Sequence, residues 1–196
     1  MKKKKRFWTI VFKALTVLLG IVLIVLIGFL LVLAQPKPED TEKPEPQPLL
    51  SPSPAMEISA EGELRSLAET FPAPVMSFMS GSGMVFVSGT SADAALGEGF
   101  GRVLTLYWQT PEGEPLILQS IYPAEGLELM GKGDYHFSDT AGPSLFGLSS
   151  VRMENGDTVR VHVQAAGRGL YTVTVPASLA GSLSGICRSI QLFSAE

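Results

Sequence analysis

The chain has 196 residues, a formal net charge of −4 and one cysteine, Cys187. Six cations lie within residues 1–13, which leaves nine Lys and Arg side chains against all nineteen Asp and Glu side chains in the remainder. Nucleic-acid phosphates are bound by clustered cations, so this acidic remainder argues against nucleic acid as a partner. A single cysteine excludes an intramolecular disulfide, and an exported domain without disulfides is typical of a Gram-positive-type bacterial envelope.

The N-terminal segment has the pattern of a membrane anchor. Residues 1–13 carry the basic cluster KKKKR, and residues 14–34 form an apolar run whose one polar side chain is Thr16. At about 1.5 Å per helical residue, this run spans about 31 Å, the thickness of a bilayer's hydrocarbon core. The cations on one side predict a single-pass transmembrane helix, with residues 1–13 cytoplasmic and everything after residue 34 extracellular. Membrane lipid is therefore the expected partner of residues 14–34.

A cleaved signal peptide is the alternative for the same segment. The tripeptide Val32-Leu33-Ala34 fits a small-x-small cleavage site. The apolar run, however, is longer than the ~7–15 residues of an ordinary signal-peptide core. The length favours an uncleaved signal-anchor and leaves open whether a minority of the molecules is cleaved.

The composition changes abruptly over residues 35–55. Seven of the fourteen prolines of the chain lie here, among Lys, Glu, Asp, Ser and Thr. Such a segment buries too little apolar surface to fold, and frequent proline keeps it extended. The sequence predicts a disordered, Pro-rich stalk that reaches up to about 65 Å at ~3.1 Å per residue.

Residues 56–196 have the periodicities of one α+β domain. A helix is expected over 61–71, capped by Ser59 and ended by Pro72 and Pro74. Alternating runs predict strands at 84–90, 102–109, 116–122, 149–153, 158–164 and 170–175. Asn155-Gly156 predicts a hairpin turn, and a short helical turn is expected between Pro123 and Gly131.

The last predicted element is a helix that begins at Pro176. Its apolar face consists of Leu179, Leu183, Ile186 and Ile190. Strands joined by short turns favour an antiparallel sheet, with an N-terminal and a C-terminal helix covering one face. The predicted architecture is therefore a transmembrane helix, a stalk, and an antiparallel α+β domain.

Two stretches carry a resemblance to a known group of proteins. RVLTLYWQTPEGEPLILQSIYP begins at Arg102, and GLYTVTVPASLAGSLSGICRSIQLF spans Gly169 to Phe193. Over residues 102–193 the chain resembles the extracytoplasmic domain of unknown function found in Gram-positive anti-sigma-factor-like and sporulation-associated membrane proteins. The resemblance implies a half-barrel related in shape to lipoprotein carriers. It does not extend to a cytoplasmic sigma-binding region, because only a short basic segment stands there.

The densest group of polar and aromatic side chains is Asp134, Tyr135, His136 and Asp139, in the stretch GKGDYHFSDT. These residues are the candidate ligand-binding site, because carboxylate, imidazole and phenol groups can hold a cation or a polar ligand. The alternative is a solvated loop in which Asp and Ser cap local turns. The sequence predicts no catalytic residue, metal site or cofactor.

Three other chemical groups have ordinary structural explanations. Cys187 lies beside Ile186 on the apolar side of the last predicted helix and is expected in the core; the alternative is a thiol nucleophile with His162 or His136 as its base. His162 occupies the polar phase of its strand and is expected at the surface. Glu125 and Glu128 are expected to form a solvated face.

Two functions remain open from the sequence. The first is a non-enzymatic, membrane-anchored binding or interaction domain, whose partner is an envelope protein, a peptide or a lipid. The second is a cell-wall- or lipid-modifying enzyme that uses the 134–139 loop or Cys187. Polar groups that converge in a pocket would favour the enzyme, and an apolar groove without such groups would favour binding.

Overall fold

The computed structural model of the protein describes residues 50, 53–131 and 133–194, all within one compact unit, residues 44–196. The predicted cytoplasmic segment 1–13, the predicted span 14–34 and most of the predicted stalk lie outside the described residues. Among the residues that are described, no helix has both the length and the apolar character needed to cross a bilayer.

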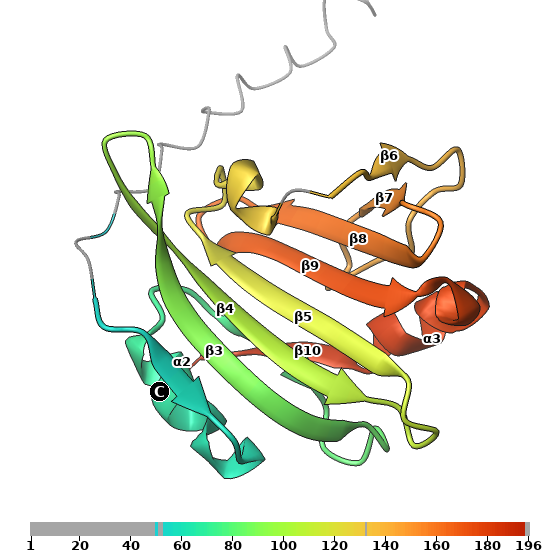
Figure 1. Cartoon of the computed structure of the whole chain (residues 1–196), viewed down its shortest axis with the longest axis horizontal. Helices are drawn as coiled ribbons and strands as arrows, with labels where there is room; N and C mark the ends of the chain where they lie inside the picture. The colour runs from blue at the N-terminus through green and yellow to red at the C-terminus, as the bar shows by residue number, and fades with distance from the viewer. Residues whose placement is uncertain (1–49, 51–52, 132, 195–196) are drawn as a thin grey trace, which may run out of the picture. The chain divides into compact units, whose positions relative to one another are not determined.

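The domain is built on one large antiparallel sheet (Figure 1). Its strands, in spatial order, are β1 (Met56–Ile58), β3 (Val85–Leu96), β4 (Gly99–Gln109), β5 (Pro115–Tyr122), β9 (Gly169–Pro176), β8 (Thr158–Ala165), β7 (Val151–Glu154) and β6 (His136–Phe137). All neighbouring pairs run antiparallel. The predicted α+β class with an antiparallel sheet is therefore confirmed.

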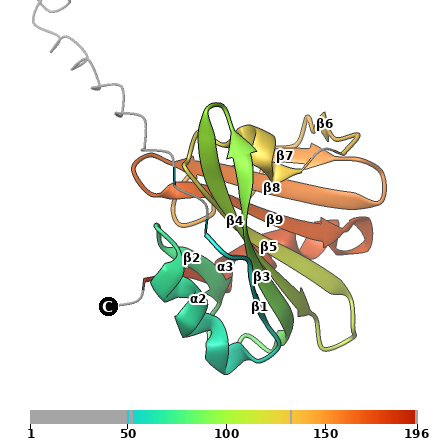
Figure 2. The ribbon, with the colours of Figure 1, turned by 60° about the vertical axis from the view of Figure 1, so that its left-hand side comes forward.

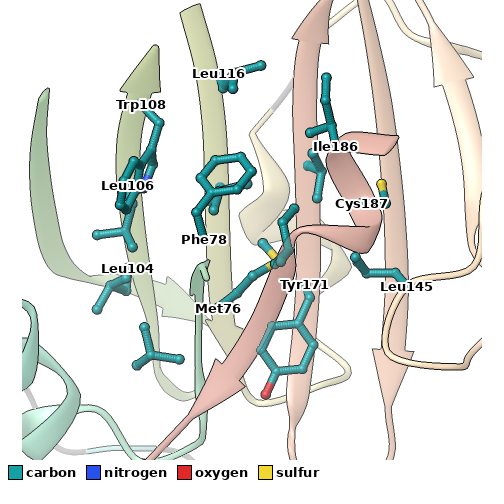
Figure 3. Close-up of a cluster of buried hydrophobic side chains, with 14 of the residues drawn as sticks. Met76, Phe78, Leu104, Leu106, Trp108, Leu116, Leu145, Tyr171, Ile186 and Cys187 are labelled. Carbon is teal, nitrogen blue, oxygen red and sulfur yellow. The ribbon is translucent and has the colours of Figure 1, made fainter. Parts of the chain in front are cut away.

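The sheet curves, and its inner face carries the core (Figures 2 and 3). Alternation places Leu104, Leu106 and Trp108 of β4 on this face, all of them buried. A two-stranded ribbon of β2 (Val75–Phe78) and β10 (Ile190–Phe193) packs against it, together with helix α3 (Leu183–Arg188). The inner face is thus covered by a ribbon as well as by helices.

Trp108 shows how tightly the ribbon and the sheet pack. Its indole makes edge-to-face contacts with Phe78 of β2 and Phe86 of β3, each at a centroid distance of 5.2 Å. The peptide N–H of Met76 donates to Ser120 Oγ of β5 at 2.9 Å, which joins the ribbon to the sheet through a buried hydrogen bond. The edge-to-face pairs and the satisfied Met76 donor stabilise this contact, whereas Trp108 Nε1 is buried without a hydrogen-bond partner among the described residues.

The N-terminal helix forms where the sequence predicts it, with a different cap. A 3-10 turn, η1 (Glu61–Glu63), leads into α2 (Leu64–Thr70), whose apolar residues are buried. Residue Ala60 occupies the N-cap of η1, so the prediction of Ser59 is wrong. Glu63 supplies the capping oxygen instead, because its carboxylate accepts hydrogen bonds from the peptide N–H groups of Ser59 and Ala60 at 3.2 Å. The helix ends before Pro72, as predicted.

The C-terminal helix is shorter than predicted. The segment after Pro176 is a 3-10 helix, η3 (Ala177–Ser182), followed by the six residues of α3. Leu183 and Ile186 are buried on α3 as expected, but Ile190 begins strand β10. A four-residue interval from Ile186 to Ile190 fits a helix, and burial on the neighbouring strand gives the same pattern.

Residues 123–131 lie against the outer face of the sheet. They follow β5 through a cis Tyr122-Pro123 peptide bond and contain the predicted helical turn, observed as 3-10 helix η2 (Leu127–Met130). A Cβ at Gly101 of β4 would clash with the side chain of Leu129 and would lie 2.7 Å from the carbonyl oxygen of Tyr122. Only glycine at position 101 lets Leu129 and the Tyr122 carbonyl come this close to β4. Residues 123–131 therefore cover one end of the outer face.

Candidate functional site

The predicted site residue Tyr135 packs on a cation of the sheet. The guanidinium of Arg160, on β8, lies 4.3 Å from the centroid of the Tyr135 ring. The phenol oxygen of Tyr135 is 2.7 Å from Thr158 Oγ1, on the same strand. A cation–π contact plus a hydrogen bond fixes the ring against the outer face of the sheet. Tyr135 is therefore held by the protein's own residues.

Arg160 also ties residues 123–131 to the sheet. Its Nη1 donates to the carbonyl oxygens of Met130 at 3.0 Å and Gly131 at 3.4 Å, and its Nε donates to Thr174 Oγ1 at 3.1 Å. One side chain thus satisfies acceptors on the loop and on the neighbouring strand. Arg160 therefore holds residues 123–131 on the sheet. Its guanidinium is already engaged by the loop carbonyls, Thr174 and the Tyr135 ring, so it is not available to a ligand at Tyr135.

The other three predicted site residues do not gather around Tyr135. His136 is exposed on the edge strand β6, opposite Glu154 of β7. Asp134 and Asp139 are exposed on either side of that short strand. Among residues 50, 53–131 and 133–194, no group of three or more His, Cys, Asp and Glu side chains is placed to hold a metal ion. The ligand-binding role of this cluster remains a prediction.

His162 is buried, so its predicted place at the surface is wrong. Only 8% of the residue is exposed, and Nδ1 has no hydrogen-bond partner within the described part of the chain. Burial lowers the pKa of the imidazole below its ordinary value, and the positive charge of Arg160 lowers it further. Alternation predicts an exposed side chain only where the outer face is solvated. Here residues 123–131 lie on that face on both sides of His162, since Arg160 Nη1 donates to the carbonyl oxygen of Met130 and Gln164 Nε2 donates to that of Ala124.

Cys187 is a core residue, as predicted. It is 2% exposed on α3, and burial raises the pKa of its thiol to about 11. A nucleophilic cysteine needs a pKa lowered by a nearby base or cation, and the shift here has the opposite sign. Neither His162 nor His136 has a hydrogen bond to the thiol in the described residues.

An apolar pocket lies at the end of the sheet where β8 turns into β9. Its volume is about 310 Å³, and it is partly open to solvent. The lining residues are Phe146, Leu148, Ala165, Ala166, Arg168 and Leu192. They come from three segments distant in sequence: the turn at 145–148, the β8–β9 turn, and β10. A volume of this size lies at the lower end of the range for small-molecule sites.

One wall of the pocket is built by an unusual turn. Leu145 and Leu148 exchange two backbone hydrogen bonds, at 3.0 and 2.9 Å, around Phe146 and Gly147. Both central residues have positive φ, 55° at Phe146 and 79° at Gly147. A type I′ turn needs this geometry, and a phenylalanine in it costs about 1–3 kcal/mol. The strain is offset by the Phe146 ring, which packs edge-on against Tyr171 with centroids 5.5 Å apart.

The pocket has one charged side chain, Arg168. Its peptide N–H closes the β8–β9 turn by donating to the carbonyl oxygen of Ala165 at 2.9 Å, beside Gly167 with φ of 70°. Its guanidinium forms no hydrogen bond or ion pair within residues 50, 53–131 and 133–194. The opening of the pocket thus combines apolar walls with one free cation.

The sequence pattern does not predict this pocket, although two local signals mark its turns. Phe-Gly between Leu145 and Leu148, and Gly-Arg-Gly at 167–169, are turn sequences. What the pattern does not show is that both turns and Leu192 meet at one end of the sheet. Leu192 reaches the pocket because residues 190–193 form strand β10, where the sequence predicts no strand.

A second hollow of about 340 Å³ lies near the β4–β5 turn. It is lined by Val87, Ser88, Tyr107, Trp108, Gln109, Pro115 and Leu116. None of these residues is charged, and the hollow brings together no group of reactive side chains. It offers apolar contact without a feature that selects a ligand.

No family model, no curated protein and no solved structure matches the chain.

Proposed function

We propose that the chain is a single-pass membrane protein whose extracytoplasmic domain binds a ligand or partner and catalyses no reaction. In this proposal residues 1–13 are cytoplasmic, residues 14–34 cross the cell membrane, and a Pro-rich stalk carries the domain outside. The basic cluster and the apolar run that follows it support this location. The curved sheet, with its covered inner face, is compatible with the half-barrel expected from the resemblance over residues 102–193 (Figure 2).

The observation that carries the binding role is the pocket beside the β8–β9 turn. Apolar walls with one polar group at the opening are typical of binding sites. The side chains that an enzyme would use do not meet there: Cys187 is buried, His136 is on the edge strand β6, and Asp134 and Asp139 are exposed near it. Binding therefore needs fewer assumptions than catalysis.

The proposed topology is tested on cells. Protease added to intact protoplasts is expected to remove the domain and to spare residues 1–13. Protection of the domain would contradict the orientation. A mature chain that begins at Gln35 and appears in the medium would show that the segment is a cleaved signal peptide.

The binding role is tested with decanol, a neutral apolar probe. The full chain is placed in nanodiscs of zwitterionic lipid, and alanine methyl groups are labelled for NMR. Decanol is expected to shift the methyl signals of Ala165 and Ala166 saturably, because both line the pocket. Ala166→Trp, which fills the pocket from an exposed position, is expected to abolish the effect. Ala177→Trp, exposed beyond the other end of β9, is the control and is expected to leave it unchanged.

The enzymatic alternative makes a different prediction about Cys187. With a thiol pKa of about 11, Cys187 in the folded protein is expected to react slowly with a thiol reagent at pH 8. Unfolding exposes the thiol and is expected to make the labelling fast. Cys187→Ala is expected to retain decanol binding. Rapid labelling of the native protein would contradict this. So would release of a product from cell-wall or lipid extracts that is lost in Cys187→Ala or Asp134→Asn.

A further inference from the structure

The cation at the pocket has no partner among the described residues. Four of the five other arginines of the domain have acceptors or ring partners: Arg102, Arg152, Arg160 and Arg188. The fifth, Arg65, is exposed on α2 and does not line the pocket. Arg168 has none among the described residues, although the chain beyond its first 13 residues carries nineteen carboxylates against nine cations. An acidic domain that keeps one unpaired guanidinium beside an apolar pocket has a complementary site for an anion.

Tyr171, whose pKa responds to the charge of Arg168, does not neutralise this cation. Tyr171 packs against Phe146, one of the residues that line the pocket, and its hydroxyl donates to the carbonyl oxygen of Pro74 at 2.9 Å. Burial raises the pKa of this phenol to about 12, while the positive charge of Arg168 acts weakly in the opposite direction. The phenol therefore stays neutral at physiological pH, and the charge of Arg168 remains available to a ligand.

The walls determine what the rest of the ligand is. Phe146, Leu148 and Leu192 present hydrocarbon to the cavity, so the ligand has an apolar portion. A volume of about 310 Å³ suits one short aliphatic chain and is too small for two long ones. An anionic group and a single chain together define an anionic amphiphile.

We propose that this pocket binds a single-chain anionic amphiphile of the fatty-acid type. The aliphatic chain lies between Phe146, Leu148 and Leu192, and the carboxylate pairs with Arg168. The inference rests on the proposed binding function and names the ligand class of the same site. A carboxylate matches the fork of a guanidinium with two parallel hydrogen bonds, which a neutral headgroup cannot form.

The test compares decanoate with decanol, which share a chain length and differ in headgroup charge. The full chain in zwitterionic nanodiscs is titrated with each probe, and the methyl shifts of Ala165 and Ala166 give the dissociation constants. Decanoate is expected to bind about tenfold more tightly than decanol, because only decanoate can form the charged pair. The difference is expected to shrink at high salt. Decyltrimethylammonium, which carries the opposite charge, is expected to bind more weakly than decanol.

Arg168→Gln tests the contribution of the headgroup contact separately from that of the apolar pocket. The side chain of this exposed residue forms no hydrogen bond or ion pair within the described residues, so the variant is expected to melt like the parent protein. It is expected to bind decanol unchanged and to bind decanoate about as weakly as decanol. Arg65→Gln, an exposed arginine of α2, is the matched control and is expected to keep the preference for decanoate.

The outcomes distinguish this inference from the proposed function. Equal affinities for the two probes, unaffected by Arg168→Gln, would overturn the anionic ligand and leave the binding pocket standing. Absence of saturable methyl shifts with every probe would overturn both. A preference for decanoate that survives Arg168→Gln would assign the headgroup to another cation and overturn the inference.

Discussion

At the scale of single residues, His162 is the group whose environment differs most from its sequence pattern. It stands in a row of side chains across the outer face, where Thr172 Oγ1 donates to Gln119 Oε1 at 3.1 Å and Gln119 Nε2 donates to Thr105 Oγ1 at 3.3 Å. The imidazole Nδ1 takes no part in this network. A buried, unpaired imidazole is tolerated while neutral and costs free energy when protonated.

The titration of His162 gives a stability prediction with a definite sign. Its folded-state pKa lies below the ordinary value of 6.5, so the unfolded chain binds the proton more readily. The stabilising contribution is therefore present above pH 6.5 and is lost as pH falls through the lowered pKa. The free energy of unfolding, measured in urea, is expected to fall between pH 7 and pH 5. His162→Gln is expected to reduce that dependence.

The control for this prediction is His136→Gln, which alters the exposed histidine on β6. It is expected to keep the dependence of the parent protein. The carboxylate of Asp93 does not confuse the result, since its hydrogen bond from Arg102 holds its pKa below 3.8 and moves its titration to more acidic solutions. A His162→Gln protein that loses stability between pH 7 and pH 5 as steeply as the parent would contradict the prediction.

At the scale of elements, long alternating strands were predictable and short buried ones were not. β4, β5, β8 and β9 appear where alternation predicts them, and Asn155 closes the β7–β8 turn by accepting hydrogen bonds from the peptide N–H groups of Asp157 and Thr158. β2 is missing from the prediction because its four residues are all buried, which removes the alternation. The sequence predicts a helix where β10 lies, because the spacing of Ile186 and Ile190 fits a helix and a buried strand equally well.

The pocket could not be predicted from the sequence for a related reason. Its walls are turns and the end of β10, and turns carry no periodicity that reports their distance from one another. Phe146 adds a further difficulty, since a phenylalanine with positive φ contradicts ordinary turn preferences. Only the tertiary contact with Tyr171 explains why that conformation holds.

The contact of α3 with the core gives the prediction at this scale. Leu183 is 2% exposed, whereas Ser184 beside it is exposed. Leu183→Asp places a carboxylate in the core without a partner and is expected to cost about 3 kcal/mol or more. Ser184→Asp changes the same helix by the same charge and is expected to stay within about 0.5 kcal/mol of the parent. Equal and small losses in denaturant unfolding would show that α3 does not pack as described.

At the scale of the whole molecule, the folded unit begins before the predicted end of the stalk. The peptide N–H of Ser53 donates to the Asp93 carboxylate, and the N–H of Leu50 donates to the carbonyl oxygen of Phe100 at 2.9 Å. Asp93 also accepts from Arg102 Nε at 2.7 Å, and Arg102 Nη1 donates to the carbonyl oxygen of Thr70 at the end of α2. The residues that join stalk and domain are therefore tied to a partly buried ion pair.

This connection predicts how two fragments differ. A fragment of residues 44–196 and one of residues 56–196 are both expected to melt cooperatively, since the core lies entirely beyond residue 56. The longer fragment is expected to be more stable by about 1 kcal/mol, or roughly 3 °C in Tm, because it keeps a hydrogen bond to a charged acceptor. Ser53→Pro in the longer fragment removes the donating N–H, together with the hydroxyl and the freedom of φ, and keeps the Leu50 hydrogen bond. It is expected to abolish the part of the difference that the bond to Asp93 contributes. Identical Tm values for the two fragments would mean that the contact at Asp93 adds nothing, and a melt without a cooperative transition would show that the domain does not fold apart from the rest of the chain.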